Sequence, residues 1–400
     1  MMIIHDIELL KLNKNFDIAY SILKDILEQR CPDLKKIEQL YGAQKSKTLQ
    51  DLIKNFISRN LRGTRIPRPH NPDSPMEIVL ARREVEKDVN YQKVHSYILL
   101  NRTPEIKYLE NFYGNYSLCV QKIISHYIEQ NLKRKCEIGA ATHLNRVGAV
   151  VFQLKMNDTG KYNYSTTAVM HDSIEDLMRL KKAKRGKGVD ADSYNKFIDE
   201  YIPNDLQEKV KILTNHYNLI LNYVLSRLEE NDRAYTKKNI LSEIEIIVLQ
   251  KTKEFNKFAE KMHKLISETE AETDLTDTIK WQCYKTLYLE GIAKETARKS
   301  DHRIYEIKGV DLSDNAHGKG ALSIDARIRN INKNLMWGIK GYAMKSTWKP
   351  FNDHIQEVIE DAYQSAEYLI LGDLLQPYSS TDFMMSALNK VIKLENVFYI

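Results

Sequence analysis

The segment AVMHDSIEDLM, residues 168–178, carries the residue types in this chain that are best suited to chemistry. On a helix, one imidazole and three carboxylates of this segment would share a face: His171, Asp172, Glu175 and Asp176. Like charges at this spacing repel one another unless a cation lies among them, so the pattern favours a divalent metal. An ordinary surface helix with a solvated acidic face is the alternative that the segment alone leaves open.

A second histidine, His143, precedes this segment in the stretch ATHLNRVGAVVFQL. Val147, Val150 and Val151 follow it at helical spacing, so the histidine belongs to an apolar stripe that should face the interior. A lone histidine on such a stripe is more often a hydrogen-bonded core residue than a ligand. The His171-Asp172 pair one element later favours the ligand interpretation.

A third polar group stands in IYEIKGVDLSDNAHGKG, where Asp311 and Asn315 are four residues apart and Asp314 lies near them. On a helix, Asp311 and Asn315 project from the same face. Two imidazoles and two carboxylates could then form a cage with positions left for water, as a catalytic metal requires. The four residues of this cage are His143, His171, Asp172 and Asp311.

The order H…HDxxED…DxxxN resembles the HD superfamily of metal-dependent phosphohydrolases, most closely the alarmone hydrolases of the RelA/SpoT type and their small stand-alone relatives. Three blocks carry the resemblance: RKCEIGAATH, AVMHDSIED and IKGVDLSDN. The resemblance implies an HD-domain helical bundle with Mn²⁺ held by His143, His171, Asp172 and Asp311. Fe²⁺, Zn²⁺ and Mg²⁺ remain alternatives, because imidazole and carboxylate together suit several divalent ions.

The resemblance also implies roles for residues around the cage. Glu175 and Asp176 would orient the attacking water. Arg134 and Lys135 would contact the nucleotide, and Asn315 would contact its ribose.

These similarities predict hydrolysis of a phosphate or pyrophosphate from a purine nucleotide, with a (p)ppGpp-like alarmone favoured. Leu177 stands where the family usually has threonine, and HGKG at 317–320 replaces the expected small residue or threonine. These departures leave the substrate more open than the reaction. The alternatives are a nucleotidase, a phosphodiesterase acting on cyclic nucleotides or oligonucleotides, and a regulator that senses a nucleotide without turnover.

The composition predicts an all-α fold, because 15 Gly and 9 Pro in 400 residues leave few turns. We expect N-terminal helices over 1–125, an HD domain over 126–345 with inserted helices at about 183–300, and C-terminal helices over 346–400. Within the insertion, continuous helical patterns cover 204–230 and 237–268. The 23 tyrosines and the long helices are compatible with a homo-oligomer.

The net charge of +6 suits a small anionic substrate, and the basic residues are not interleaved with aromatics as a nucleic-acid site would need. The four cysteines are scattered without a CxxC pair, which predicts reduced thiols in the cytoplasm. There is no signal-peptide pattern and no run of roughly 18 apolar residues, so no membrane segment is expected.

Overall fold

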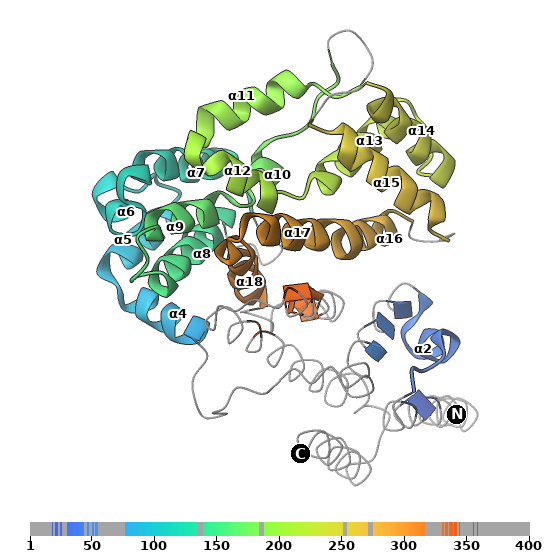
Figure 1. The fold of residues 1–400 in the computed structure, drawn as a ribbon, viewed down its shortest axis with the longest axis horizontal. Coiled ribbons are helices and arrows are strands. Elements are labelled where there is room, and N and C mark those ends of the chain that lie inside the picture. Colours follow the sequence, from blue (N-terminus) through green and yellow to red (C-terminus); the bar gives the residue numbers. More distant parts are fainter. Residues whose placement is uncertain are drawn as a thin grey trace, which may run out of the picture. The chain divides into compact units, whose positions relative to one another are not determined.

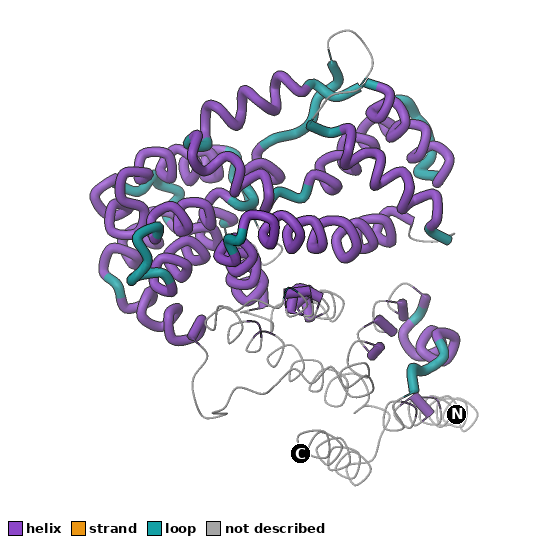
Figure 2. Tube along the Cα trace, viewed as in Figure 1, coloured by secondary structure: helices purple, strands orange, loops and turns teal. Residues whose placement is uncertain are grey.

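The computed structural model describes residues 77–133, 139–183, 188–250, 254–270 and 275–316 continuously, together with a smaller set of residues between 18 and 54 and between 330 and 358. Over these residues the secondary structure is helical, with two isolated β-bridges, Lys133 to Gly139 and Lys182 to Val189 (Figure 2). The prediction of an all-α fold is therefore confirmed. No helix among the described residues combines the length and the apolar character that a membrane span requires.

The chain divides into two compact units. The first comprises residues 1–74, 315–342 and 355–400, and its described helix is α2, Leu34–Tyr41. The second comprises residues 75–314 and 343–354 and contains the predicted metal ligands. These limits differ from the expected boundaries at 125 and 345, because helices before residue 125 pack against those that carry the site. The predicted insertion at about 183–300 lies wholly in the second unit.

The second unit begins with a group of helices that lie close together and include α8 and α9 (Figure 1). In chain order they are α4 (Glu77–Lys87), α5 (Val89–Leu99), α6 (Ile106–Tyr113), α7 (Ser117–Glu129), α8 (Ala140–Leu154), α9 (Lys161–Met170) and α10 (Ser173–Leu177).

The later helices extend the unit and return to the site with α18. They are α11 (Ala191–Tyr201), α12 (Asn204–Leu213), α13 (His216–Glu230), α14 (Lys237–Leu249), α15 (Asn256–Glu268), α16 (Leu275–Gln282), the π-helical turn η2 (Cys283–Tyr288), α17 (Leu289–Lys299) and α18 (His302–Ala316). Helices α16 and α17 run on from each other through η2 (Figure 1).

The continuous helices predicted over 204–230 and 237–268 are each two helices in the structure. The first is interrupted at Thr214 and Asn215, where the Asn215 side chain accepts a hydrogen bond from the Asn218 amide and caps the start of α13. The second is interrupted after Leu249, where Gln250 bonds through its side chain to both backbone groups of Val189. At the first break, a side-chain hydrogen bond to the backbone thus starts a new helix where periodicity alone predicts a continuous one.

Close packing of α8 on α9 sets the distance between the two predicted histidine ligands. Gly148 permits this approach, because a Cβ atom there would lie 2.4 Å from Val169 Cγ2 and 2.9 Å from Tyr113 Oη. Val147, Ala149 and Val150 of α8 are fully buried at the same level. The apolar stripe predicted after His143 is therefore a core face, and it brings the histidine into the interior.

Candidate metal centre

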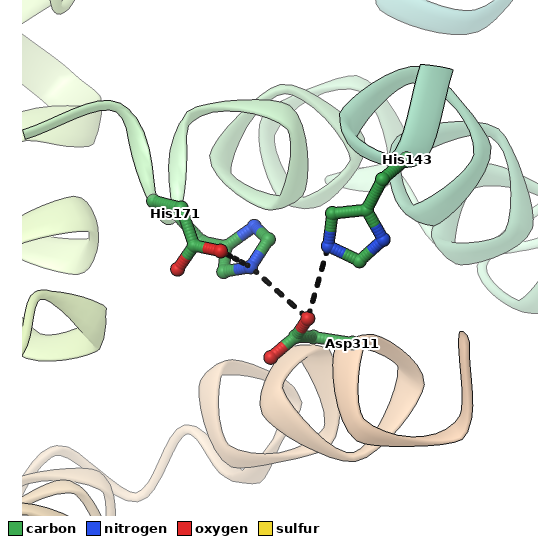
Figure 3. Close-up of side chains that lie close together, drawn as sticks. His143, His171 and Asp311 are labelled. Atoms are coloured by element: carbon green, nitrogen blue, oxygen red, sulfur yellow. Dashed lines mark ion pairs between the residues drawn. The ribbon is translucent and has the colours of Figure 1, made fainter. Parts of the chain in front are cut away.

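Four side chains from three separate parts of the second unit meet in one cluster; Figure 3 shows three of them, His143, His171 and Asp311. His143 comes from the first turn of α8, His171 and Asp172 lie between α9 and α10, and Asp311 comes from α18. Each residue offers one ligand atom, and these atoms all lie within 4.8 Å of one another. The structure thus brings together the four residues that the sequence predicted as a cage, and the group could hold a divalent metal.

Asp311 stands between the two imidazoles (Figure 3). Its Oδ1 atom lies 3.1 Å from His143 Nε2 and 3.4 Å from His171 Nε2. Asp172 Oδ2 lies 3.0 Å from the same His171 nitrogen. The Nε2 atoms therefore face carboxylate oxygens from α18 and from the α9–α10 junction.

Hydrogen bonds on the far side of each ring fix which nitrogen faces the cluster. His171 Nδ1 donates to the Ala168 carbonyl at 2.6 Å, and His143 Nδ1 donates to Asp314 Oδ2 at 2.7 Å. In a neutral imidazole this leaves the lone pair on Nε2. Neither Nε2 has a hydrogen-bond partner among the described residues, although both are buried. Lone pairs pointing at carboxylates repel them, and a cation at this place would relieve the repulsion.

The segment 168–178 is not the single helix that the sequence predicted. Helix α9 ends at Met170, and α10 begins at Ser173, so His171 and Asp172 form the junction. Two of the last backbone carbonyls of α9 accept hydrogen bonds from side chains. His171 Nδ1 donates to the Ala168 carbonyl, and Ser173 Oγ donates to the Met170 carbonyl. This interruption directs both His171 Nε2 and the Asp172 carboxylate toward Asp311.

Three residues that were not predicted as site residues support the ligands through ion pairs and hydrogen bonds. They are Lys308, Asp314 and Arg146. Lys308 Nζ lies 2.7 Å from Asp311 Oδ2, so it pairs with the oxygen that does not face the imidazoles. Asp314 accepts two hydrogen bonds from Arg146 in addition to the one from His143. A helical spacing of three residues was the available signal, since it relates Lys308 to Asp311, Asp311 to Asp314, and His143 to Arg146.

The two predicted catalytic acids lie one turn beyond Asp172. Glu175 accepts a hydrogen bond from the backbone N–H of Asn215 at 2.6 Å, and Asp176 accepts one from the Tyr127 hydroxyl at 2.9 Å. Desolvation and the neighbouring Asp172 carboxylate raise the pKa of both acids. The two carboxyl groups are therefore anchored beside the cluster, in an environment that favours proton uptake.

The charges of the cluster shift the pKa values of its members in opposite directions. Burial would lower the pKa of His171, but the carboxylates of Asp172 and Asp311 raise it to about 10. Burial would raise the pKa of Asp311, but Lys308 and His171 hold it well below its usual range. A proton on His171 is thus one way to supply the positive charge that the carboxylates require, and a metal ion is another.

The cluster opens toward solvent on one side. The side chain of Asp172 is 27% exposed, whereas those of His143, His171 and Asp311 are at most 4% exposed. Asp176, which follows Asp172 by one turn, is exposed as well. The open side of the cluster is therefore the side of Asp172 and Asp176, and the imidazoles and Asp311 lie deeper.

Of the three predicted substrate-binding residues, the structure describes only Asn315. Asn315 lies on α18 one turn beyond Asp311 and is partly buried. Arg134 and Lys135 lie outside the described residues.

No protein-family model matches this chain, and no curated protein and no solved structure matches it either.

Proposed function

We propose that this chain is an HD-type, metal-dependent phosphohydrolase that removes phosphate or pyrophosphate from a purine nucleotide, with a (p)ppGpp-like alarmone as the favoured substrate. One observation carries the proposal. Two buried histidine nitrogens without hydrogen-bond partners converge on the carboxylates of Asp172 and Asp311. Two further acids, Glu175 and Asp176, stand beside this group on its open side.

The proposed metal is Mn²⁺. His143, His171, Asp172 and Asp311 would hold it, and a donor set of two imidazoles and two carboxylates suits Mn²⁺, Fe²⁺ or Zn²⁺ better than Mg²⁺. When bound, such an ion supplies Lewis acidity toward a phosphoryl oxygen and toward a water molecule. Lys308 keeps Asp311 Oδ2 occupied, so Asp311 would bind through Oδ1 alone.

Glu175 and Asp176 would orient the attacking water and accept its proton. Both carboxyl groups are fixed by hydrogen bonds, Glu175 by the Asn215 amide and Asp176 by Tyr127. Fixed geometry favours a single orientation of the water, and a raised pKa suits a group that must take up a proton.

The substrate class follows from charge and from the resemblance to the alarmone hydrolases. Arg134 and Lys135 would contact the nucleotide phosphates, and Asn315 would contact the ribose. We propose a cytoplasmic setting, because the described cysteines Cys31, Cys119 and Cys283 are free thiols.

A nucleotide-sensing regulator without turnover is the second candidate. The buried ion pair between Lys308 and Asp311 favours it, because an ammonium group already supplies part of the positive charge inside the cluster. A nucleotidase or a phosphodiesterase would use the same metal site on a different substrate.

The deciding experiment combines metal analysis with a substrate panel. Purified protein is loaded with Mn²⁺, checked by elemental analysis, and incubated with nucleotides that include guanosine tetraphosphate, cyclic nucleotides and short oligonucleotides. Separate detection of phosphate, pyrophosphate and ring-opened products distinguishes the three hydrolytic activities. The His171→Ala variant is the negative control, and His216→Gln controls for loss of a buried histidine elsewhere in the same unit.

We expect metal-dependent release of pyrophosphate or phosphate from a purine nucleotide by the wild type and by His216→Gln. Tight nucleotide binding with no product over hours would favour the regulator. Protein that binds no divalent ion after loading would overturn the proposal.

A further inference from the structure

The two candidate histidine ligands are held by different acceptors. His171 Nδ1 donates to a backbone carbonyl of its own chain segment, that of Ala168. His143 Nδ1 donates to a carboxylate on α18, that of Asp314, which lies 171 residues later in the sequence. The orientation of His143 therefore depends on a tertiary contact between α8 and α18.

Asp314 is itself fixed by two arginines. Arg146 donates from Nε to Asp314 Oδ1 and from Nη2 to Oδ2, which is a two-pronged hydrogen bond. Arg82 Nη2 lies 3.4 Å from Asp314 Oδ1. The Asp314 side chain is 1% exposed, so these donors replace the water that an ionised carboxylate would otherwise need.

This arrangement leaves His143 one tautomer. A carboxylate paired with two guanidinium groups accepts hydrogen bonds and donates none, so the proton of a neutral His143 must lie on Nδ1. The Nε2 lone pair then points at Asp311, at the place where the metal is proposed. Hydrogen bonds of this kind from a ligand imidazole to a carboxylate orient the ring and increase its strength as a ligand.

We propose that Asp314 is a positioning residue of the metal centre, which holds His143 in the Nδ1-protonated tautomer and is itself locked by Arg146 and Arg82. This inference rests on the proposed metal site, though not on the identity of the substrate. Asp314 touches neither the metal nor the substrate. It acts through His143.

Replacement of Asp314 by asparagine is the direct test. The single amide oxygen would be claimed by the arginines, which turns the amide nitrogen toward His143 and favours the tautomer with the proton on Nε2. That tautomer cannot ligate through Nε2. We therefore expect Asp314→Asn to weaken Mn²⁺ binding about 10- to 100-fold, the usual range for the outer partner of a ligand histidine.

The chain offers a matched control on the same pair of helices. Glu306 of α18 is buried and forms an ion pair with Lys155, which caps the end of α8. Glu306→Gln thus removes a buried carboxylate that joins α8 to α18, as Asp314→Asn does. We expect its Mn²⁺ affinity to stay within about twofold of the wild type, since metal affinity depends on the ligands and their direct partners.

A spectroscopic measurement on the wild type keeps the inference testable if Asp314→Asn does not fold. Long-range ¹H–¹⁵N correlation on metal-free protein with ¹⁵N-labelled histidine reports which ring nitrogen of His143 carries the proton, with His143→Gln used for assignment. In a ring that carries a single proton we expect that proton on Nδ1. A singly protonated ring with its proton on Nε2 would overturn the inference.

The outcomes for the site and for Asp314 are separable. Wild-type protein that binds none of Mn²⁺, Fe²⁺ or Zn²⁺ would overturn the proposed function. If the wild type binds Mn²⁺ and a folded Asp314→Asn variant binds it equally well, only the role of Asp314 is overturned.

Discussion

Two buried histidine environments in the second unit differ in what surrounds the ring. His216 of α13 stacks on Phe258, accepts a hydrogen bond from Tyr194 at Nε2 and donates from Nδ1 to the Thr214 carbonyl. Both ring nitrogens are satisfied, and burial lowers the pKa of His216 to about 4. It is a neutral core residue.

His171 is equally buried, yet its second nitrogen has no hydrogen-bond partner and faces carboxylates on two sides. Those carboxylates raise its pKa to about 10, in the direction opposite to His216. Burial of a histidine therefore says little about function. A buried ring nitrogen that has no hydrogen-bond partner and faces carboxylates is the feature that distinguishes a candidate ligand from a core residue.

The largest expected effect separates these two histidines directly. His171→Ala or Asp172→Ala should weaken Mn²⁺ binding by at least a hundredfold, beyond the roughly 10- to 100-fold that outer partners contribute, and should abolish hydrolysis. His216→Gln should retain both properties. Calorimetric titration with Mn²⁺ measures binding, and circular dichroism checks that helix content is kept. Unchanged binding in His171→Ala would show that the cluster is not the metal site.

The next effect concerns rate rather than binding. Glu175→Gln should keep Mn²⁺ affinity within a few fold, because Glu175 is not among the four ligands. Its turnover should fall by about 10²- to 10⁴-fold, the usual contribution of a positioned general base. Single-turnover kinetics at saturating metal measures this loss. Equal losses of metal and activity would instead make Glu175 part of the metal-binding group.

His171 and His216 should also differ in their effect on the pH dependence of metal binding. A metal ion must displace the proton that His171 retains below a pKa of about 10. Affinity for Mn²⁺ should therefore rise with pH, by up to about tenfold per unit between pH 6.5 and 8 for one displaced proton. Titrations in buffers of different ionisation enthalpy count the proton released. His216→Gln should show the same slope, since His216 is not at the site.

The smallest effect is expected at His216 and concerns stability. Its folded pKa of about 4 lies below the ordinary value of about 6.5, so the unfolded chain binds the extra proton first as the pH falls. The stability it contributes is present above pH 6.5 and is lost progressively toward pH 4. Between pH 7 and pH 5 the wild type should lose about 2 kcal/mol of unfolding free energy through this residue. Urea unfolding of wild type and His216→Gln at both pH values measures the difference, which should be absent from the variant.

The general class of fold was predictable from composition and periodicity. Few glycines and prolines, with apolar residues at helical spacing, were sufficient to predict an all-α protein. The helix boundaries were not predictable in the same way. The breaks at Asn215 and after Met170 depend on side-chain hydrogen bonds to the backbone, which hydrophobic periodicity does not record.

The predicted ligands were found together, while their supporting residues were missed. Imidazole and carboxylate side chains suggest metal binding by their type alone, and all four residues of the cage are of these two types. Lys308 and Arg146 are ordinary charged residues on helices, and their spacing alone suits solvated positions equally well. Only packing shows that Lys308 is turned inward to Asp311 and that Arg146 meets Asp314.

The sequence by itself determined which chemical groups lie within one helical turn of one another, because backbone geometry fixes neighbours three and four residues apart. It therefore indicated that Glu175 and Asp176 lie one turn beyond Asp172. It did not indicate the break between α9 and α10, which turns His171 and Asp172 toward Asp311. Tertiary structure decided that α8 and α18 close on the α9–α10 junction, and which nitrogen of His143 faces inward. These features depend on contacts between residues far apart in the chain, such as Gly148 with Val169 and His143 with Asp314, and local patterning cannot specify them.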